Sequence, residues 1–308
     1  MMERVDVLAL GEAMVEFNSA RSADPRVWLQ GAGGDTSNMA IAAARLGARS
    51  GYVSRVRNDP FGRMLLALWR DEGVVTDGVA VDDDAPTGVY FVSHGARGHE
   101  FSYLRKRSAA SLLTPTTLPL ECIRATCVLH LSAISQAISA SACDACFAAV
   151  DAARDAGVRI SYDTNLRLAL WPLRRARAIV FETMRHADWA LPGHDDAAHL
   201  FGNDDPDAIV DACHALGPEI VVLKLGRDGC LVSDGHRRER IDGVRVDAVD
   251  ATGAGDCFDG AFAVRIVAGD DAFKAARYAN AAAALATTGY GAVAPLPRAA
   301  DVARLLGE

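Results

Sequence analysis

The stretch VDATGAGDCFDG, residues 249–260, decides how the rest of this chain is interpreted. Gly253 and Gly255 can adopt backbone conformations that other residues avoid, so this loop can turn N–H groups toward an anion. An apolar helical pattern begins after Cys257, and a helix N-terminus adds partial positive charge at the same place. Asp256 would then accept the proton of an attacking hydroxyl, as phosphoryl transfer requires. The alternative, a glycine-rich turn that only caps a buried helix, explains the combination less well.

Composition and charge exclude several classes of protein. The chain has 308 residues, half of them hydrophobic, so it can bury a large core. Its formal net charge is −8 and no run is rich in lysine or arginine, which argues against nucleic acid or an anionic membrane as partner. No apolar stretch approaches the ~18–20 residues of a membrane span. The N-terminal VDVLALGEAM lacks the basic segment of a signal peptide, so we expect a cytoplasmic protein.

The seven cysteines argue against a disulfide scaffold, because their number is odd and no secretion signal precedes them. Cys143 and Cys146 form a C-x-x-C inside a helical pattern. Two small residues on a packed helix face explain this pair better than a redox or metal site. Cys257 follows the predicted base at a helix N-terminus, where a lowered thiol pKa and reactivity are expected. The alternative is that its side chain points into the core.

Strand-like and helical segments alternate along most of the chain. Continuous apolar runs separated by amphipathic stretches predict an α/β fold with a mainly parallel sheet covered on both faces. Asp59 and Pro60 are the residue types expected at the N-cap and first position of a helix. Residues 254–306 are predicted to be almost entirely alanine-rich helix. The expected strands lie at 5–11, 50–56, 127–134, 158–165, 188–192 and 219–226, and the expected helices at 36–47, 59–73, 141–157, 173–187 and 207–217.

Residues 87–105 break this alternation, because they resemble two strands joined by a glycine-rich turn that contains Gly95 and Gly98. A hairpin inserted into an α/β chain is a candidate lid. Aromatic and basic side chains on it, those of Tyr90, Tyr103 and Arg105, could then close over a ligand.

A second glycine-rich run, GAGGDTSNMAIAAARLG, occupies residues 31–47. Dinucleotide binding is disfavoured, because position 36 is threonine where that fingerprint needs its third glycine. We expect instead that Gly33 and Gly34 let a polyol approach the backbone closely. Asp35 and Asn38 would hydrogen-bond its hydroxyls from the start of the following helix. The chain also lacks the G-x-x-x-x-G-K-[ST] motif of P-loop kinases.

Together these two runs resemble a known family. GGDTSN at 33–38 and DATGAGD at 250–256 are similar to the two signatures of the ribokinase-like (PfkB) carbohydrate kinases. GEAMVEF at 11–17, the Y-x-R of YLRKRSAA at 103–110 and DTNLRLALW at 163–171 resemble one subgroup, 2-keto-3-deoxygluconate kinase. An arginine in these runs suits recognition of a sugar acid, because a guanidinium can pair a carboxylate through two hydrogen bonds.

The resemblance implies a fold and an organisation. The fold would be a ribokinase-like three-layer α/β/α sandwich with a mainly parallel sheet and a small β lid. Residues 1–308 would form a single kinase domain, and the lid would be made by N-terminal segments that include the hairpin 87–105. A homo-oligomer formed through the lid is a further expectation.

The resemblance also implies the site residues. The catalytic set would be the base Asp256 with the anion hole of Gly253, Ala254 and Gly255. The substrate would be bound by Gly33, Gly34, Asp35, Asn38, Tyr90, Tyr103, Arg105, Arg167 and Asp256. The nucleotide would be bound by Asn165, Arg167, Lys224, Gly226, Arg227, Gly229, Gly253, Ala254, Gly255 and Asn280.

Two departures from the family pattern concern the metal and the anion hole. At 192–196 the chain reads PGHDD, where many relatives have an Asn-x-x-Glu that organises magnesium through water. His194, Asp195 and Asp196 therefore leave the metal-organising residue open. Ala251 stands where many members have threonine, which removes one hydroxyl and leaves the base untouched.

The resemblance implies an enzyme that uses ATP and Mg²⁺ to phosphorylate 2-keto-3-deoxygluconate to 2-keto-3-deoxy-6-phosphogluconate. A monovalent cation is a further candidate cofactor. Asp256 would accept the proton of the terminal hydroxyl, and Arg105 would hold the acid group. The alternatives are a kinase of fructose or 5-keto-2-deoxygluconate, and a non-catalytic sugar-acid-binding protein on the same fold.

Overall fold

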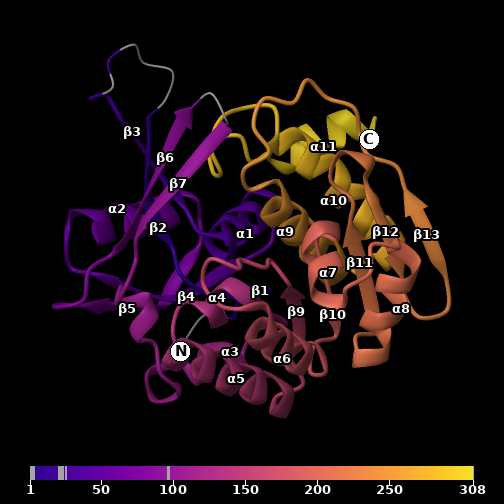
Figure 1. Ribbon diagram of the computed structural model, residues 1–308, viewed down its shortest axis with the longest axis horizontal. Coiled ribbons are helices and arrows are strands. Elements are labelled where there is room, and N and C mark those ends of the chain that lie inside the picture. Colours follow the sequence, from indigo (N-terminus) through magenta and orange to yellow (C-terminus); the bar gives the residue numbers. More distant parts are fainter. Residues whose placement is uncertain (1–3, 20–23, 25, 96–97, 308) are drawn as a thin grey trace.

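Two β-sheets organise the chain in the computed structural model, which describes residues 4–307 apart from 20–23, 25 and 96–97 (Figure 1). From edge to edge, the described strands of the larger sheet are β13 (Arg238–Ile241), β12 (Cys230–Ser233), β11 (Ile220–Lys224), β10 (Trp189–Ala190), β9 (Arg159–Asp163), β8 (Val128–Ser132), β1 (Val7–Leu10), β4 (Ser50–Arg57) and β5 (Val75–Asp82). The strands from β11 to β5 run parallel, and β12 pairs antiparallel with both of its neighbours, β11 and β13.

The smaller sheet is built from the N-terminal third of the chain. Its described strands, in order, are β3 (Leu29–Gly33), β2 (Met14–Asn18), β6 (Gly88–Gly95) and β7 (Gly98–Leu104). Strands β6 and β7 pair antiparallel, from Val89 opposite Leu104 to Gly95 opposite Gly98. The hairpin predicted at 87–105 is therefore confirmed, and residues 96–97 of its turn lie outside the described residues.

Helices cover both faces of the larger sheet, which makes three layers. One face carries α1 (Asp35–Arg45), α2 (Pro60–Asp71), α9 (Ala254–Val267), α10 (Ala272–Ala286) and α11 (Ala299–Leu306). The other carries α3 (Leu120–Arg124), α4 (Ala133–Ala137), α5 (Ala140–Asp155), α6 (Leu173–Met184), α7 (His194–Phe201) and α8 (Pro206–Leu216). Within the described part of the chain, no helix is long and apolar enough to cross a bilayer.

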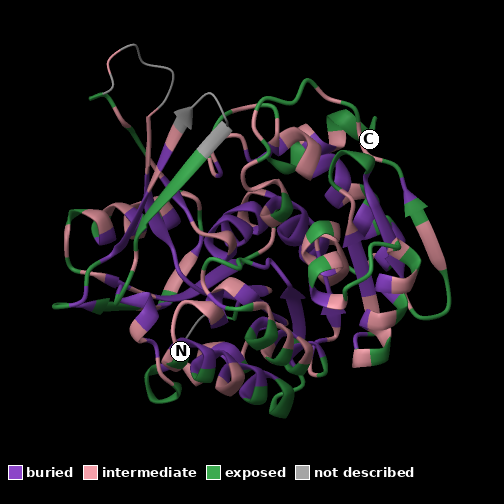
Figure 2. Ribbon diagram, in the orientation of Figure 1, coloured by how far each residue is buried: buried purple, intermediate pink, exposed green. Residues whose placement is uncertain are grey.

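The two-sided cover explains why the central strands are continuously apolar. Side chains of a strand alternate between its faces, so Val7 and Ala9 enter one core while Leu8 and Leu10 enter the other. Figure 2 shows the central strands buried along their length. The expected α/β sandwich is therefore confirmed.

Several local expectations can be compared with the structure. Asp59 caps α2, because its Oδ1 accepts a hydrogen bond from the Gly62 N–H at 2.7 Å. Cys143 and Cys146 are buried on α5, as the packed-face interpretation requires. The expectation for 254–306 is partly wrong, since residues 287–298 form a loop between α10 and α11. The strands β2, β3, β5 and β13 and the helix α7 were not predicted; they are short or carry many exposed positions, so hydrophobic periodicity hardly marks them.

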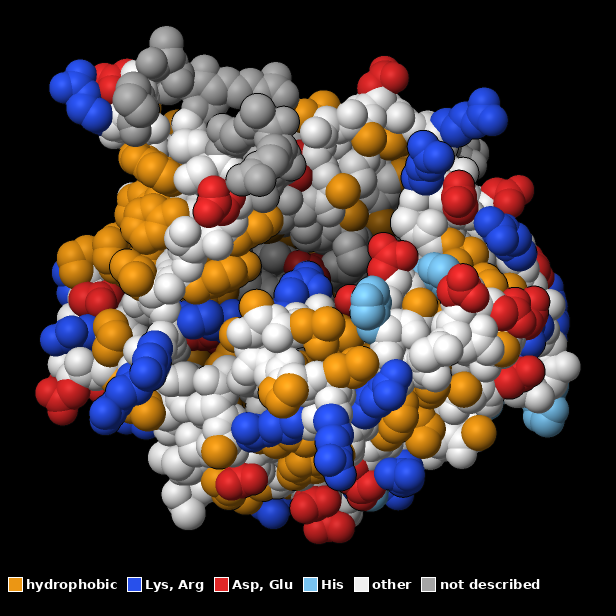
Figure 3. Space-filling view, viewed as in Figure 1, with side chains coloured by type: hydrophobic (Ala, Val, Ile, Leu, Met, Phe, Trp, Pro, Cys, Tyr) orange, Lys and Arg blue, Asp and Glu red, His pale blue; other side chains and the backbone are white. Residues whose placement is uncertain are grey.

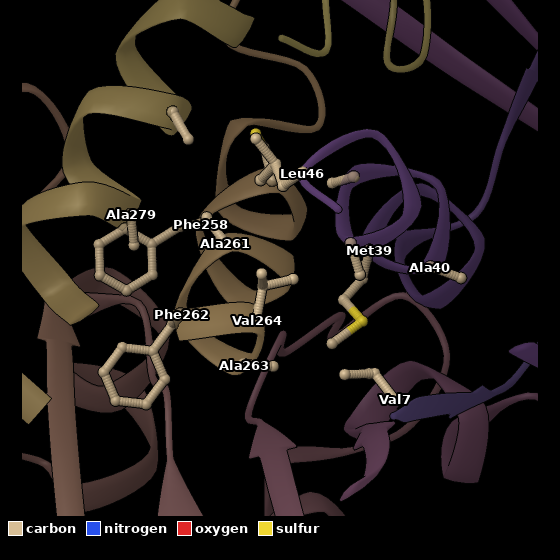
Figure 4. Close-up of a cluster of buried hydrophobic side chains, with 14 of the residues drawn as sticks. Val7, Met39, Ala40, Leu46, Phe258, Ala261, Phe262, Ala263, Val264 and Ala279 are labelled. Carbon is tan, nitrogen blue, oxygen red and sulfur yellow. The ribbon is translucent and has the colours of Figure 1, made fainter. Parts of the chain in front are cut away.

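Helix α9 lies between α1 and α10, and its packing fixes the position of its N-terminus (Figure 4). Phe258 and Phe262 are buried on the side toward α10, while Met39 of α1 packs against the opposite side. Gly260 lets the helices approach closely, because a β-carbon there would lie 2.7 Å from the Met39 carbonyl oxygen. The α1–α9 contact therefore depends on the absence of a side chain at residue 260.

We predict that Gly260→Ala destabilises the protein, because the added methyl group would force α1 and α9 apart. Overpacking of this kind costs about 1–3 kcal/mol, which outweighs the better helix propensity of alanine. Urea unfolding measures the change. Gly193→Ala is the matched control, since the nearest atom to its added β-carbon is 3.9 Å away. Equal stabilities of the two variants would contradict the packing argument.

Candidate active site

A cavity of about 1200 Å³ lies between the smaller sheet, the carboxyl ends of the parallel strands and the N-terminus of α9. Asp163 ends β9 and Lys224 ends β11, and both line it. In Figure 3 the surface is hollowed near the centre of the view, where charged side chains gather. Open α/β sheets bind ligands at this end of their strands, because the helix N-termini and the loops converge there.

The N-terminus of α9 forms the predicted anion site. Gly253 is the N-cap, with a left-handed backbone (φ 78°, ψ 0°), and no described side chain caps the helix. A β-carbon at Gly253 would also approach the Ala292 carbonyl oxygen to 2.9 Å, so the loop 287–298 packs directly against this turn. The uncapped first turn of a helix offers N–H groups and positive potential to an anion.

Asp256 lies in the first turn of α9 and lines the cavity. Its Oδ2 accepts a hydrogen bond of 2.8 Å from Nδ2 of Asn38 in α1. Burial, together with the neighbouring carboxylate of Asp35, raises the pKa of Asp256 to about 7. A carboxyl group with such a pKa is suited to act as a general base at neutral pH.

Asp35 begins α1, and burial raises the pKa of its carboxyl group. Nδ2 of Asn165 donates a hydrogen bond of 2.9 Å to its Oδ2. Asn165 therefore joins the loop after β9 to the predicted sugar-binding end. The sequence placed Asn165 with the nucleotide, and the structure adds this contact with the substrate group.

Lys224 is the centre of a buried ionic cluster. Its Nζ donates hydrogen bonds to Asp163 Oδ2 at 3.1 Å and to Asp259 Oδ1 at 2.9 Å. Burial lowers the pKa of Lys224, but the two carboxylates outweigh burial and hold that pKa above its usual value. The ammonium group is therefore charged at neutral pH.

Aromatic side chains of the smaller sheet form the wall opposite α9. The rings of Tyr90 and Tyr103 stack with centroids 5.9 Å apart, and both line the cavity. The Tyr90 hydroxyl donates to the buried Glu16 carboxylate. Gly33 gives this hydroxyl its space, because a β-carbon there would lie 2.2 Å from it.

Arg105 lies in the same wall but already has a partner. Its guanidinium forms an ion pair with the Glu12 carboxylate, which also accepts a hydrogen bond from the Ser108 hydroxyl. Burial raises the pKa of Glu12, and the guanidinium and the hydroxyl oppose that rise. We expected Arg105 to hold the acid group of the substrate. In the structure its guanidinium is already paired with a carboxylate of the protein, that of Glu12.

Most of the predicted site residues meet in this one cavity. Those that line it are Gly34, Asp35, Asn38, Tyr90, Tyr103, Arg105, Asn165, Arg167, Lys224, Gly226, Gly253, Gly255 and Asp256. Five others do not line it. Gly33 and Ala254 adjoin it in the chain, and Gly229 shapes the turn after Gly226, with its φ of 93°. Roles of individual residues in binding remain predictions.

Arg227 and Asn280 are the two predicted nucleotide residues whose surroundings differ from the expectation. The Arg227 side chain is 97% exposed and does not line the cavity. Asn280 is buried on α10, where its Nδ2 lies 3.4 Å from the Ile241 carbonyl oxygen and 3.5 Å from the Cys230 sulfur. It therefore supports the packing of α10 on the sheet.

The cavity also contains residues that the sequence did not single out for it. Glu12 and Asp163 line it, and Asp259 lies behind it; Asp196, which the sequence had already named as a candidate to organise the metal, lines it as well. Glu12 and Asp163 belong to runs already quoted for the family resemblance. Their place in those motifs was the feature of the sequence that could have indicated a position in the cavity. Oδ2 of Asp196 accepts a hydrogen bond of 2.9 Å from the Leu166 N–H, which holds this carboxylate at the cavity.

The expectation of a reactive Cys257 is wrong. Its side chain is fully buried in the hydrophobic core. Burial raises the pKa of the thiol, and the neighbouring Asp256 and Asp259 carboxylates add to the rise. Desolvation therefore outweighs the favourable field of the helix N-terminus.

Comparison with known proteins agrees with this geometry. The family model described as pfkB family carbohydrate kinase matches residues 5–299. Fructokinase-1 of Zea mays is 35% identical over 97% of this chain and 97% of its own length. A ribokinase II structure from E. coli with ATP and Mg²⁺ has a TM-score of 0.91, at 26% identity over 98% of this chain and 99% of that one.

A second solved structure contains a sugar. It is a double mutant of the fructokinase from Vibrio cholerae O395 with fructose, ADP and a potassium ion. It is 28% identical over 99% of this chain and 100% of that one, with a TM-score of 0.87.

We predict that Asp256→Asn lowers kcat by about 10²–10⁴, because it keeps the shape of the side chain and removes the proton acceptor. Steady-state kinetics give the change, and calorimetry with MgATP checks that nucleotide binding persists. A variant that keeps more than about a third of kcat would show that Asp256 is not the base.

The raised pKa of Asp256 predicts the pH dependence of the reaction. Only the ionised carboxylate accepts a proton, so kcat/KM falls as the pH decreases through about 7 and is level above that pH. Initial rates between pH 5 and 9 in buffers of constant ionic strength measure this limb. A profile that is flat down to pH 5 would contradict the assignment.

Proposed function

The chain belongs to the PfkB family of carbohydrate kinases, and we propose that it transfers the terminal phosphoryl group of ATP to the C6 hydroxyl of a six-carbon keto sugar, fructose in the first place. The fructokinase relatives support fructose over 2-keto-3-deoxygluconate, which the sequence motifs alone had favoured.

The observation that carries the choice of a neutral sugar is the buried ion pair between Arg105 and Glu12. A guanidinium that is already neutralised gains little from a substrate carboxylate. The nearby carboxylates of Asp35 and Asp256 would repel one. A neutral ketose avoids both problems, because its hydroxyls can donate hydrogen bonds to these carboxylates.

The hydrogen bonds of Asn38 indicate where the reacting hydroxyl of the sugar would lie, next to Asp256. Its Nδ2 donates to Asp256, and its Oδ1 is buried without a hydrogen-bond partner among the described residues. Buried polar atoms seldom lack a partner, so this oxygen is available to a sugar hydroxyl. Asn38 would thus orient both the sugar and the carboxylate of the base.

The reaction follows from these parts. Asp256 takes the proton of the C6 hydroxyl as the hydroxyl oxygen attacks the terminal phosphorus of ATP. The bond from this phosphorus to the bridging oxygen breaks at the same time, and ADP leaves. The N–H groups of the first turn of α9 stabilise the charge on the transferred phosphoryl group. The smaller sheet would act as a lid that excludes water and so limits hydrolysis of ATP.

Magnesium would be held mainly by the phosphates of ATP. The described residues contain no cluster of three or more carboxylate, histidine or cysteine groups that could bind a metal by itself. Asp196 fits a water-mediated contact, because its partly exposed carboxylate lines the cavity, and Mg²⁺ keeps several of its waters in proteins. When bound, the ion neutralises charge on the phosphates. The potassium ion in the fructokinase relative supports testing a monovalent cation as well.

A sugar acid remains the second candidate substrate, because Arg167 lines the cavity with its side chain half exposed. Its nearest carboxylate partner, Asp196, lies 4.0 Å away. This guanidinium could pair with an acid group that Arg105 cannot accept.

We predict that fructose has a kcat/KM at least about tenfold above that of 2-keto-3-deoxygluconate, since an unmatched charge costs roughly 1–3 kcal/mol in such a site. A coupled assay of ADP formation compares fructose, ribose, gluconate and 2-keto-3-deoxygluconate, with Asp256→Asn as the blank. Preference for 2-keto-3-deoxygluconate would identify the sugar acid as the substrate.

A further inference from the structure

The choice of lysine at residue 224 is unusual for this chain. The sequence has three lysines and 29 arginines, so most of its positively charged side chains are arginines. Lys106 is exposed, and the side chain of Lys274 is 63% exposed. The side chain of Lys224 is only 13% exposed, and it lies among carboxylates at the edge of the cavity. A compact ammonium fits between them where a planar guanidinium would not.

Lys224 connects three elements that meet at the cavity. Its Nζ binds Asp163 at the end of β9 and Asp259 on α9, and these carboxylates are 7% and 1% exposed. Its own N–H donates to the Pro192 carbonyl oxygen at 2.8 Å, which fixes the loop before α7. A β-carbon at Gly255 would lie 3.7 Å from Nζ, so the ammonium reaches the anion-binding turn.

The contact with Asp259 has a consequence for the base. Asp256 and Asp259 are three residues apart, so they lie on one face of α9, one turn from each other. An anchor at Asp259 therefore sets the rotation and the height of the turn that carries Asp256. Misplacement of a reacting group by about 1 Å can lower a rate about 10²-fold.

We propose that Lys224 is the positioning residue of the phosphoryl-transfer site: through Asp259 and Asp163 it fixes the N-terminal turn of α9, and its charge keeps Asp256 available as the base. This inference rests on the proposed kinase reaction. It differs from the expectation that Lys224 simply binds the nucleotide.

The surroundings of Asp256 make this charge important. The charged and titratable groups that act on it are Asp35 from α1, Asp163 from β9, Lys224 from β11 and Tyr90 from β6, and Asp259 follows one turn later on α9. Burial and the carboxylates raise the pKa of Asp256, and Lys224 opposes that rise. Without Lys224 the base would hold its proton to higher pH.

The test compares Lys224→Met with the same substitution at the exposed Lys274. We expect Lys224→Met to lower kcat about 10²-fold with little change in KM for ATP or sugar, and to shift the acid limb of the pH profile upward by at least about one unit. Lys274→Met should match the wild type. A phosphate-binding role would instead raise KM for ATP and leave the limb in place, which would overturn the proposal.

A double variant separates position from charge and guards against loss of folding. Lys224→Met with Asp163→Asn removes one charge of each sign, so the net charge of the cluster is unchanged and Asp259 is the one carboxylate of the pair that loses its ammonium partner. We expect its kcat to stay low while its acid limb returns close to that of the wild type. If the folded double variant had the kcat of the wild type, the proposal that Lys224 positions the N-terminal turn of α9 would be refuted. A wild-type enzyme inactive on every sugar would refute the proposed function instead.

Discussion

The structure depends on one constraint, that the N-terminus of α9 must be rigidly placed and yet left open. An uncapped helix end at Gly253 offers N–H groups to an anion only while no side chain of the protein satisfies them. Close packing supplies the rigidity, through Gly260 against α1 and the phenylalanines against α10. The loop 287–298 completes the support, because Ala292 lies against the glycine that makes the turn.

Electrostatics impose the second constraint. Asp163 and Asp259 are buried and Asp35 and Asp256 are partly buried around one cavity, and ionising any of these carboxyl groups without a partner would destabilise the protein. The pKa values of these carboxyl groups are shifted in opposite directions. Lys224 lowers the pKa of Asp163 against burial, while burial raises the pKa of Asp256 to about 7. Asp163 thereby stays ionised, and Asp256 has a pKa that suits the proposed role of a base near neutral pH.

The pairing of charges also explains why the sequence motifs indicate a sugar acid as substrate while the similar proteins are fructokinases. The Y-x-R run places Arg105 in the sugar wall, as an acid-binding site would require. Glu12 then pairs with it from the loop between β1 and β2, so the charge offered to the substrate is small. A cation in a motif shows that charge is present, but its neighbours decide whether that charge is free. The structure therefore supports a neutral ketose more than the motif alone did.

The sequence by itself determined the family and the layered α/β fold, and it predicted the anion site and its base, because glycine positions, apolar periodicity and the aspartate are local in the chain. It also predicted that Asp35, Asn38, Tyr90 and Arg105 gather at one end of the site. Only the tertiary structure decided which charges are already paired. Glu12 meets Arg105, and Asp259 and Asp163 meet Lys224, across separations of 35 to 93 residues that no local pattern encodes. It likewise decided that Cys257 is buried, because the direction of a helix face depends on what packs against it.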